Sequence, residues 1–210
     1  MSQAPTKTKT RRLRLGPRSA GVLLTTEEFD RARFVEGWRY ELINEVLVVS
    51  PIPSLNERDP NEELGYFLRA YQESHPQGSA LDLTIGEQTI ETKKNRRRAD
   101  RVIWAGLGRL PDPNETPTII IELVSKGKIN QERDYVAKRA EYREIGVKEY
   151  WIIDRFSRTM TVCLFAADRD QELVIAADQT YATTLLPGYE LALRRLLELA
   201  ERWGKKRKPR

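Results

Sequence analysis

The sequence predicts a mixed α/β fold with a central mixed β-sheet flanked by helices. Two observations predict it: segments with β-strand patterning alternate with amphipathic helical segments, and residues 118–154 read as strand, helix and strand. A strand–helix–strand unit places its two strands parallel in one sheet, so we expect this unit at the sheet centre. The 210 residues suffice for one domain.

The first half of the chain begins with a short helix, expected after residue 25 or 26, where two acids follow the capping threonines. Residues 40–50 are β-rich with a break at Asn44, which predicts a hairpin. Apolar residues recur at helical spacing over 61–73 and predict a helix. The loop before that helix is marked by Pro51, Pro53 and Pro60.

The second half alternates strands and helices. Helices are predicted over 130–145, ending at Gly146, and over 190–203. The basic run 93–98 reads as a turn between two strands. The predicted strands cover 80–92, 100–105, 118–125, 149–154, 159–165 and 173–175.

Residue composition excludes several classes of protein. A single cysteine, Cys163, cannot form an internal disulfide and fits a reducing cytoplasm. One cysteine and one histidine, His75, cannot build a His/Cys zinc site, and His75 falls in a loop as a structural or surface residue. No apolar run approaches the roughly 18 residues of a membrane span. Any chemistry therefore rests on carboxylates, lysines and a hard metal ion.

The net charge of +5 is concentrated at the ends of the chain. Residues 1–18 and 202–210 carry six bases each and no acid, whereas the remaining 183 residues hold 24 bases and 31 acids. We expect a basic tail over 1–24, one domain over 25–203 and a basic tail over 204–210. Such tails either attract phosphate backbones or are simply solvated ends.

Glu122 lies inside an apolar strand that reads as covered on both faces. A buried glutamate needs a partner or a metal, and the structural alternative is a salt bridge to an arginine. Asp100 stands at the start of a second strand, about twenty residues earlier, and neighbouring strands would bring the two carboxylates together. Two acids at one site need a cation, and oxygen ligands favour Mg²⁺ or Mn²⁺.

Basic residues next to this pair would hold a polyanion. Lys126 and Lys128 follow the Glu122 strand in a glycine-containing loop. The run before Asp100 has the alternative of a solvated hairpin turn. It consists of Lys93, Lys94, Arg96, Arg97 and Arg98.

Two further residues are candidates for catalysis. Glu41, at the entry to the first hairpin, would bind a second ion or position water, or is an edge-strand surface charge. Lys138 is the candidate for the amine that stabilises transition-state charge, because helical geometry places it on the same side as Asp134 and Tyr142. The alternative for Lys138 is an exposed i, i+4 pair with Asp134.

These residues resemble a known family over roughly residues 25–200. The resemblance is to the Uma-type restriction endonuclease family of the PD-(D/E)XK nuclease superfamily. The most specific matches are 122–125 and 146–151. The others are Tyr40-Glu41-Leu42-Ile43, Ser50-Pro51, Ala99-Asp100, Asp134 with Lys138 and Tyr142, and the continuation to Asp154.

The resemblance implies a restriction-endonuclease-like fold in which Asp100 and Glu122 hold magnesium, with the carbonyl of Leu123 as a further ligand. The superfamily lysine normally stands two residues after the glutamate, where this chain has Val124, and its role matches Lys138 instead. The chain also departs at Ala99, where the family usually has proline, at the hairpin turn 44–45, and at 56–61, where a common histidine is missing.

The sequence therefore predicts a cytoplasmic, magnesium-dependent DNA endonuclease that hydrolyses phosphodiester bonds by metal-activated water. The alternative is a catalytically inactive nucleic-acid-binding or regulatory module of the same fold, and a weaker one is a hydrolase of another phosphate ester. By analogy with the superfamily we expect a homodimer, and we expect no membrane association.

Overall fold

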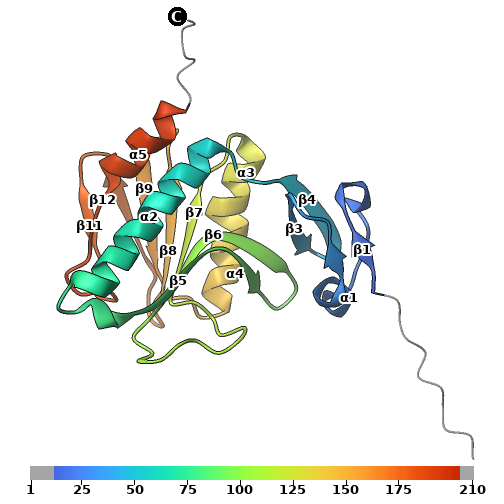
Figure 1. Cartoon of the computed structure of the whole chain (residues 1–210), viewed down its shortest axis with the longest axis horizontal. Coiled ribbons are helices and arrows are strands. Elements are labelled where there is room, and N and C mark those ends of the chain that lie inside the picture. Colours follow the sequence, from blue (N-terminus) through green and yellow to red (C-terminus); the bar gives the residue numbers. More distant parts are fainter. Residues whose placement is uncertain (1–11, 204–210) are drawn as a thin grey trace, which may run out of the picture. The chain divides into compact units, whose positions relative to one another are not determined.

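The structure is a computed structural model that describes residues 12–203 (Figure 1). The chain divides into two compact units, the first comprising residues up to Ile52 together with Lys94–Arg96, and the second Pro53–Lys93 together with the residues from Arg97 on. Most bases of the two expected tails fall at 1–11 and 204–210, outside the described residues. No helix within 12–203 is long and apolar enough to cross a membrane.

The first unit is built on an antiparallel hairpin around a small apolar core. Asn44 and Glu45 form its turn with φ of 49° and 65°, which confirms the break expected there, and Asn95 Oδ1 accepts a hydrogen bond from Asn44 N at 2.8 Å. A capping box between Thr25 and Glu28 begins the expected short helix. The elements are β1 (Arg14–Leu15), η1 (Pro17–Ser19), α1 (Thr26–Arg31), β2 (Arg33–Phe34), β3 (Trp38–Ile43) and β4 (Val46–Pro51).

Residues 12–24 are ordered structure and not a tail. β1 pairs in parallel with β2, and Leu23 bridges to Val46. Leu15 and Leu24 are buried in the core of the first unit. The expectation of a tail over 1–24 is therefore wrong for this segment, since its leucines supply part of the core that covers the hairpin.

The second unit contains a mixed sheet with the strand order β10-β9-β8-β7-β6, and β5 pairs with β6. β7 and β8 run parallel, with Ile121 opposite Trp151, which confirms the strand–helix–strand prediction. β6 runs antiparallel to β7, with Arg101 opposite Ile121. The strands are β5 (Leu81–Glu91), β6 (Arg96–Ala105), β7 (Ile119–Leu123), β8 (Glu149–Asp154), β9 (Thr159–Leu164) and β10 (Gln171–Ala176).

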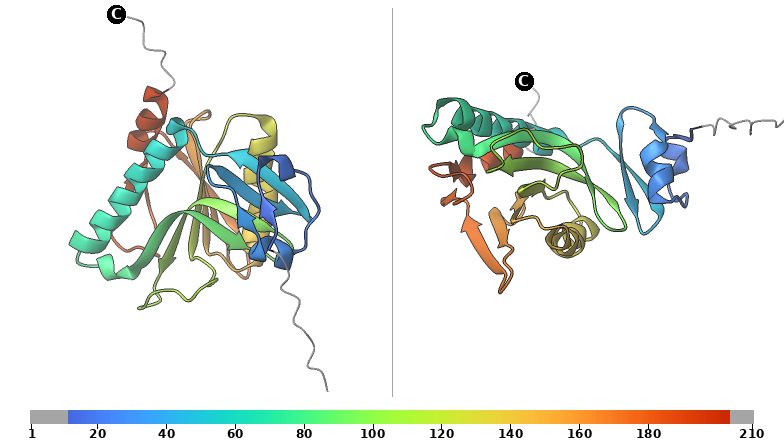
Figure 2. Two further views of the ribbon diagram at one scale, coloured as in Figure 1. Left: turned by 45° about the vertical axis from the view of Figure 1, so that its right-hand side comes forward. Right: turned by 90° about the horizontal axis from the view of Figure 1, so that it is seen from below.

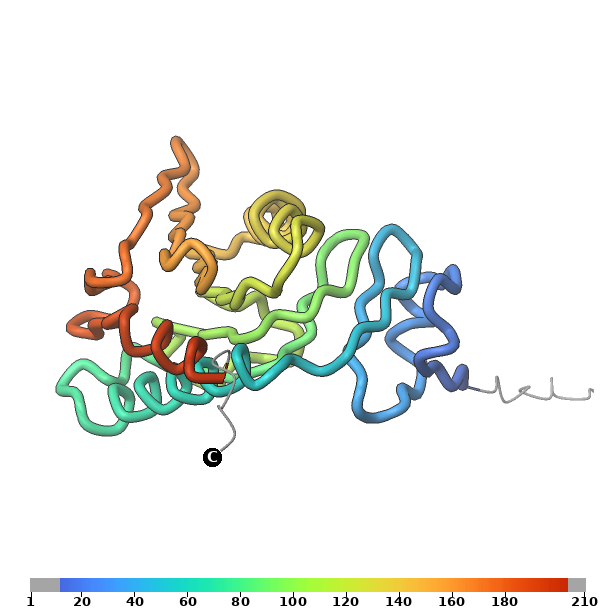
Figure 3. The backbone as a smooth tube through the Cα atoms, turned by 90° about the horizontal axis from the view of Figure 1, so that it is seen from above, coloured from blue at the N-terminus to red at the C-terminus, as the bar shows by residue number. Residues whose placement is uncertain are grey.

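Helices cover both faces of this sheet (Figure 2). On one face, α2 (Leu55–Ser74) and α5 (Leu193–Arg202) lie side by side and pack on a core that includes Ile103, Ile121 and Trp151. On the other face lies the helical segment 128–144, which Figure 3 shows nearly end-on as one continuous coil.

The start of α2 and the short strands near the C-terminus differ from the sequence prediction. A capping box between Ser54 and Glu57 begins α2 at Leu55, and Pro60 lies inside the helix instead of ahead of it. The strand pair β11 (Thr180–Ala182) and β12 (Glu190–Ala192) has no counterpart in the prediction, and α5 begins only after it. A further short helix, η2 (Gly78–Ala80), precedes β5.

Candidate active site

Asp100 and Glu122 lie on adjacent antiparallel strands of the second unit. Continuing the register from Arg101 and Ile121 by one residue places Asp100 opposite Glu122. Both are buried, at 5% and 2% exposure. Asp100 Oδ2 accepts a hydrogen bond from the backbone N–H of Leu123 at 2.8 Å. This carboxylate therefore takes the place of a backbone carbonyl where the hydrogen bonds between β6 and β7 end.

Lys138 brings its ammonium group to Glu122. The distance from Nζ to Glu122 Oε1 is 2.8 Å, and the distance to Asp134 Oδ1 is 3.7 Å. Nζ also donates to the carbonyl of Arg98 at 3.1 Å. Lys138 is 1% exposed, so the alternative of an exposed Asp134–Lys138 pair is wrong, and the partner of Glu122 is this lysine and not an arginine.

Two tyrosines that are 0% exposed complete the packing around these charges. The hydroxyl of Tyr142 donates to Glu122 Oε1 at 3.0 Å, and that of Tyr150 donates to the carbonyl of Asp134 at 2.9 Å. Their rings meet edge to face, with centroids 5.1 Å apart. Sequence reasoning placed Tyr142 on the correct helix side but missed Tyr150, whose signal is a polar aromatic in a buried strand.

A π-helical turn carries the lysine. The expected helix over 130–145 is present as α3 (Lys128–Glu132), the π-helix η3 (Arg133–Lys138) and α4 (Arg139–Glu144), followed by Gly146 with φ 90°. Both Asp134 and Lys138 belong to the π-helical turn and both are buried. Single π turns inside α-helices occur frequently at functional sites.

Burial and like charges dominate the electrostatics of this cluster. The pKa of Glu122 is raised to about 8, first by burial and further by Asp100 and Asp134, while the ammonium of Lys138 acts in the opposite direction. Arg133 Nε donates to Asp134 Oδ1 at 3.0 Å and balances part of the negative charge. Three carboxylates concentrated in a buried place, with a strongly shifted pKa, are typical of a functional site.

The donor set of the cluster suits a small hard cation. Over residues 12–203 the structure has no group of three or more His, Cys, Asp or Glu side chains arranged to hold a metal. Magnesium is commonly held by one or two carboxylates, with water and substrate phosphates as its other ligands. Asp100 and Glu122, with the neighbouring backbone at Leu123, fit that requirement.

Comparison with known proteins agrees with the geometry. The family model described as "Uma2: Putative restriction endonuclease" matches residues 26–194. The chain belongs to this family. The family predicted from the sequence is thereby confirmed.

A solved structure shares the fold of this Uma2 family member. It is described as a "putative nuclease belonging to DUF820 from Anabaena variabilis ATCC 29413", with a TM-score of 0.64 and 14% identity. The match covers 84% of this chain and 99% of the other. No curated protein matches this chain. The likeness confirms the restriction-endonuclease-like α/β fold with its mixed sheet and flanking helices.

The basic run of this Uma2 protein, predicted to hold a polyanion with a solvated hairpin turn as the alternative, is only partly a turn. The turn holds residues 93–95, whereas Arg96, Arg97 and Arg98 belong to β6. Each of these arginines has a carboxylate partner, at 2.7 Å for Arg96, 2.5 Å for Arg97 and 3.4 Å for Arg98. The partners are Asp30, Glu141 and Glu87, respectively. Their charge is therefore largely balanced within the protein.

The other predicted site residues take varied positions. Glu41 is buried on β3 in the first unit. Lys94, Lys126 and Lys128 are exposed, and exposed Lys93 pairs with Glu144 at 2.5 Å.

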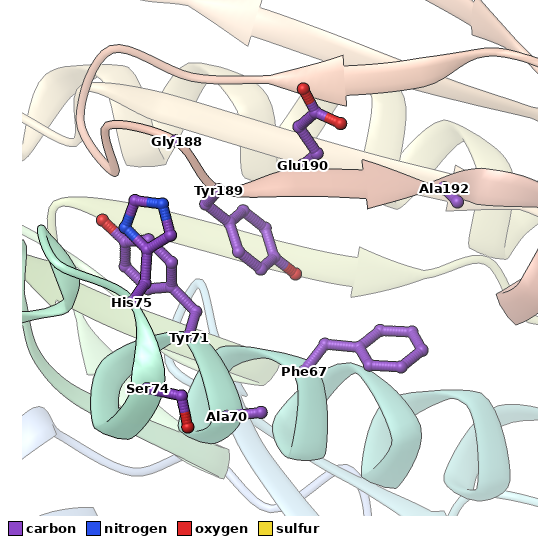
Figure 4. Close-up of a pocket in the computed structure, with 9 residues that line it drawn as sticks. All are labelled: Phe67, Ala70, Tyr71, Ser74, His75, Gly188, Tyr189, Glu190 and Ala192. Carbon is purple, nitrogen blue, oxygen red and sulfur yellow. The ribbon is translucent and has the colours of Figure 1, made fainter.

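A separate cavity of about 480 Å³ lies between the end of α2 and β12 (Figure 4). His75 stacks on Tyr71 there, with ring centroids 5.0 Å apart, and Tyr189 and Phe67 lie further along the cavity. None of its lining residues belongs to the acid–lysine cluster. His75 thus has a packing role, and the cavity is not the candidate active site.

Proposed function

We propose that this protein is a DNA endonuclease that depends on Mg²⁺ or Mn²⁺ and hydrolyses phosphodiester bonds at the acid–lysine cluster. The observation that carries the proposal is the 2.8 Å approach of Lys138 Nζ to Glu122 Oε1 inside a core that also buries Asp100 and Asp134. Membership of the Uma2 family supports a nuclease.

Energetics support a functional reason for these buried charges. Each ion taken out of water costs several kcal/mol, and an apolar pair of similar size is often neutral or more stabilising than a buried ion pair. A fold selected only for stability has little reason to keep three acids and a lysine here. We therefore assign the cluster to chemistry.

Each residue has a distinct proposed role. Asp100, Glu122 and the Leu123 carbonyl would hold the ion, which when bound supplies Lewis-acid activation of water and neutralises phosphate charge. Lys138 would orient the attacking water and stabilise negative charge on the phosphate. Tyr142 holds Glu122 in place, because its hydroxyl donates to the carboxylate that faces Lys138.

The other candidate residues would bind the DNA substrate or assist the cleavage reaction. Lys126 and Lys128 are exposed next to the Glu122 strand and would bind the DNA backbone, as would Lys93 and Lys94 in the exposed turn. For Glu41 the proposed role remains that of an acid that binds a second ion or positions water. Two copies of the chain would cut the two strands of a duplex, which is the reason to propose a homodimer.

The test is cleavage of supercoiled plasmid and of single-stranded DNA by the full chain with MgCl₂ or MnCl₂, compared with Glu122→Gln. The matched control is Glu149→Gln, since Glu149 is also buried on the same sheet and lies outside the cluster. We expect cleavage by the wild type and the control and none by Glu122→Gln. Equal cleavage by Glu122→Gln would overturn the mechanism, and DNA binding without cleavage would favour the inactive module.

A further inference from the structure

A second charged site lies on the opposite face of the sheet from the acid–lysine cluster. Arg101 follows Asp100 in β6, and successive strand residues point to opposite faces. Its guanidinium lines a groove of about 560 Å³ between α2 and β5, together with Arg69, Asn61, Gly65 and Gly86. The groove lies wholly within the second unit.

Arg101 is buried but has neutral hydrogen-bond acceptors. It is 5% exposed, and it donates to Asn61 Oδ1 at 2.7 Å, to Asn61 O at 2.9 Å and to Thr84 Oγ1 at 3.3 Å. Within the described part of the chain no carboxylate lies within 4.0 Å of its guanidinium, in contrast to the three arginines 96–98. A buried charge with no carboxylate in direct contact is costly, and only three of its five N–H groups are used by these bonds.

Two glycines leave space around this guanidinium. A Cβ at Gly65 would lie 2.6 Å from Arg101 Nη2, so a side chain there would displace the arginine. A Cβ at Gly86 would lie 3.5 Å from the same atom, an ordinary contact, so Arg101 itself does not require glycine there. Neither glycine has a positive φ, although glycine inside a helix or a strand costs roughly 0.5–1 kcal/mol relative to alanine. The missing side chain at Gly86 keeps the groove open beside Nη2.

A second cation stands close to Arg101. Arg69 donates from Nη2 to the carbonyl of Thr84 at 3.2 Å and lines the same groove. The pKa of Arg101 is lowered, first by burial and also by the charge of Arg69, while Glu62 acts in the opposite direction. Two acids, Glu62 and Glu87, also line the groove, and Glu87 pairs with Arg98 at 3.4 Å. The groove therefore offers two adjacent guanidinium groups to an anion.

We propose that this groove binds a phosphate group, whose oxygens accept hydrogen bonds from the guanidinium groups of Arg101 and Arg69. Planar guanidinium groups match the tetrahedral oxygens of phosphate in paired hydrogen bonds. The phosphate is either that of a small phosphate ion or ester or that of a DNA backbone. Binding at this face involves none of the residues proposed for cleavage.

The experiment measures binding by calorimetry with inorganic phosphate and by fluorescence anisotropy with a 20-base-pair duplex, in EDTA and at constant ionic strength. The protein is the full chain carrying Glu122→Gln, so that cleavage plays no part in the result. The test variants are Arg69→Gln, which removes a cation, and Gly86→Leu, which fills the groove beside Arg101 Nη2. Arg143→Gln is the control, because Arg143 is an exposed arginine paired elsewhere with Asp170.

We expect phosphate to bind, with at least tenfold weaker binding after Arg69→Gln, none detectable after Gly86→Leu and an unchanged affinity in the control. If the same two variants weaken duplex binding and phosphate competes with DNA, the occupant is a backbone phosphate. If duplex binding is unchanged, the occupant is a small phosphate compound. No phosphate binding by the parent protein, or equal binding by all variants with unchanged melting temperatures, would overturn the proposal whether or not the wild type cleaves DNA.

Discussion

Two buried glutamates occupy opposite ends of the parallel strand pair β7 and β8, and their surroundings differ. Glu149, opposite Ile119, accepts hydrogen bonds from the neutral groups of Thr183 at 2.5 Å, Trp151 at 2.8 Å and Tyr181 at 3.0 Å. Glu122, opposite Ile152, faces an ammonium group and two further carboxylates.

The difference separates a structural role from a chemical one. Neutral donors around Glu149 join β8 to the segment after β10. The cluster at Glu122 keeps like charges together, an arrangement that stability alone does not favour. Burial of a glutamate is therefore not sufficient to identify a site, whereas the charges that surround it are informative.

The largest expected effect is on folding, when Lys138→Met leaves Glu122 buried without its ammonium partner. Breaking a buried pair in this way typically costs about 3–5 kcal/mol. The double variant Glu122→Gln/Lys138→Met should recover much of this loss, because the uncompensated charge is gone. Urea unfolding of the wild type, of the two single variants Lys138→Met and Glu122→Gln, and of the double variant measures these free energies. An additive double variant would show that the two side chains do not interact.

The next effect is on cleavage. Lys138→Met should reduce the rate of plasmid cleavage by about 10²–10³-fold, the loss typical of removing one group that stabilises transition-state charge. The rate is measured below the melting temperature of the variant. Lys148→Met, an exposed lysine near the end of the same helical segment, is the control and should cleave normally. Full activity in Lys138→Met would remove this lysine from the mechanism.

The third effect is a pH dependence of stability in EDTA. The folded pKa of Glu122, about 8, lies above the unfolded value of 4.5, so the folded state binds the proton more tightly. The free energy of unfolding that this tighter proton binding adds is fully present below pH 4.5. A few kcal/mol of it are lost as the pH rises to about 8. Glu122→Gln should flatten the decline between pH 5 and 8, and Glu149→Gln should retain it. An identical slope in Glu122→Gln would contradict the assignment.

The smallest effect compares two tyrosines that donate to the two glutamates. Tyr142→Phe and Tyr181→Phe each remove one hydrogen bond to a carboxylate, and each should cost about 1.5 kcal/mol of unfolding free energy. Only Tyr142→Phe should also slow DNA cleavage, since only that hydroxyl contacts the proposed metal ligand. Slower cleavage in both variants would mean that the lost hydrogen bond slows cleavage by destabilising the fold, and not by acting on the proposed metal ligand.

Much of the fold and the centre of the site are readable from the sequence. An apolar strand with one glutamate, a helix and a second apolar strand determine the parallel pair at Glu122, because strand composition and crossover handedness leave few arrangements. Helical spacing places Lys138 on the buried side. These inferences depend on local patterns, and the structure agrees with them.

Features that depend on distant partners are harder to predict. Arg96, Arg97 and Arg98 are a basic run in the sequence. They belong to a strand because each pairs with a carboxylate from a distant part of the chain, namely Asp30, Glu141 and Glu87. The segment 12–24 has the composition of a basic tail, but its leucines are buried in the core beneath the hairpin. Arg101 likewise gives no local signal, since its groove depends on two glycines from a helix and another strand.

The π-helical turn makes the spacing between Asp134 and Tyr142 depend on a single inserted residue. An ordinary α-helix turns about 100° for each residue, so the eight residues from Asp134 to Tyr142 would leave these two side chains about 80° apart around the helix axis. The wider π turn at Arg133–Lys138 offsets part of that rotation. Variation in this stretch is thus restricted in backbone conformation as well as in residue type, because a change that abolished the π turn would rotate Tyr142 away from Asp134.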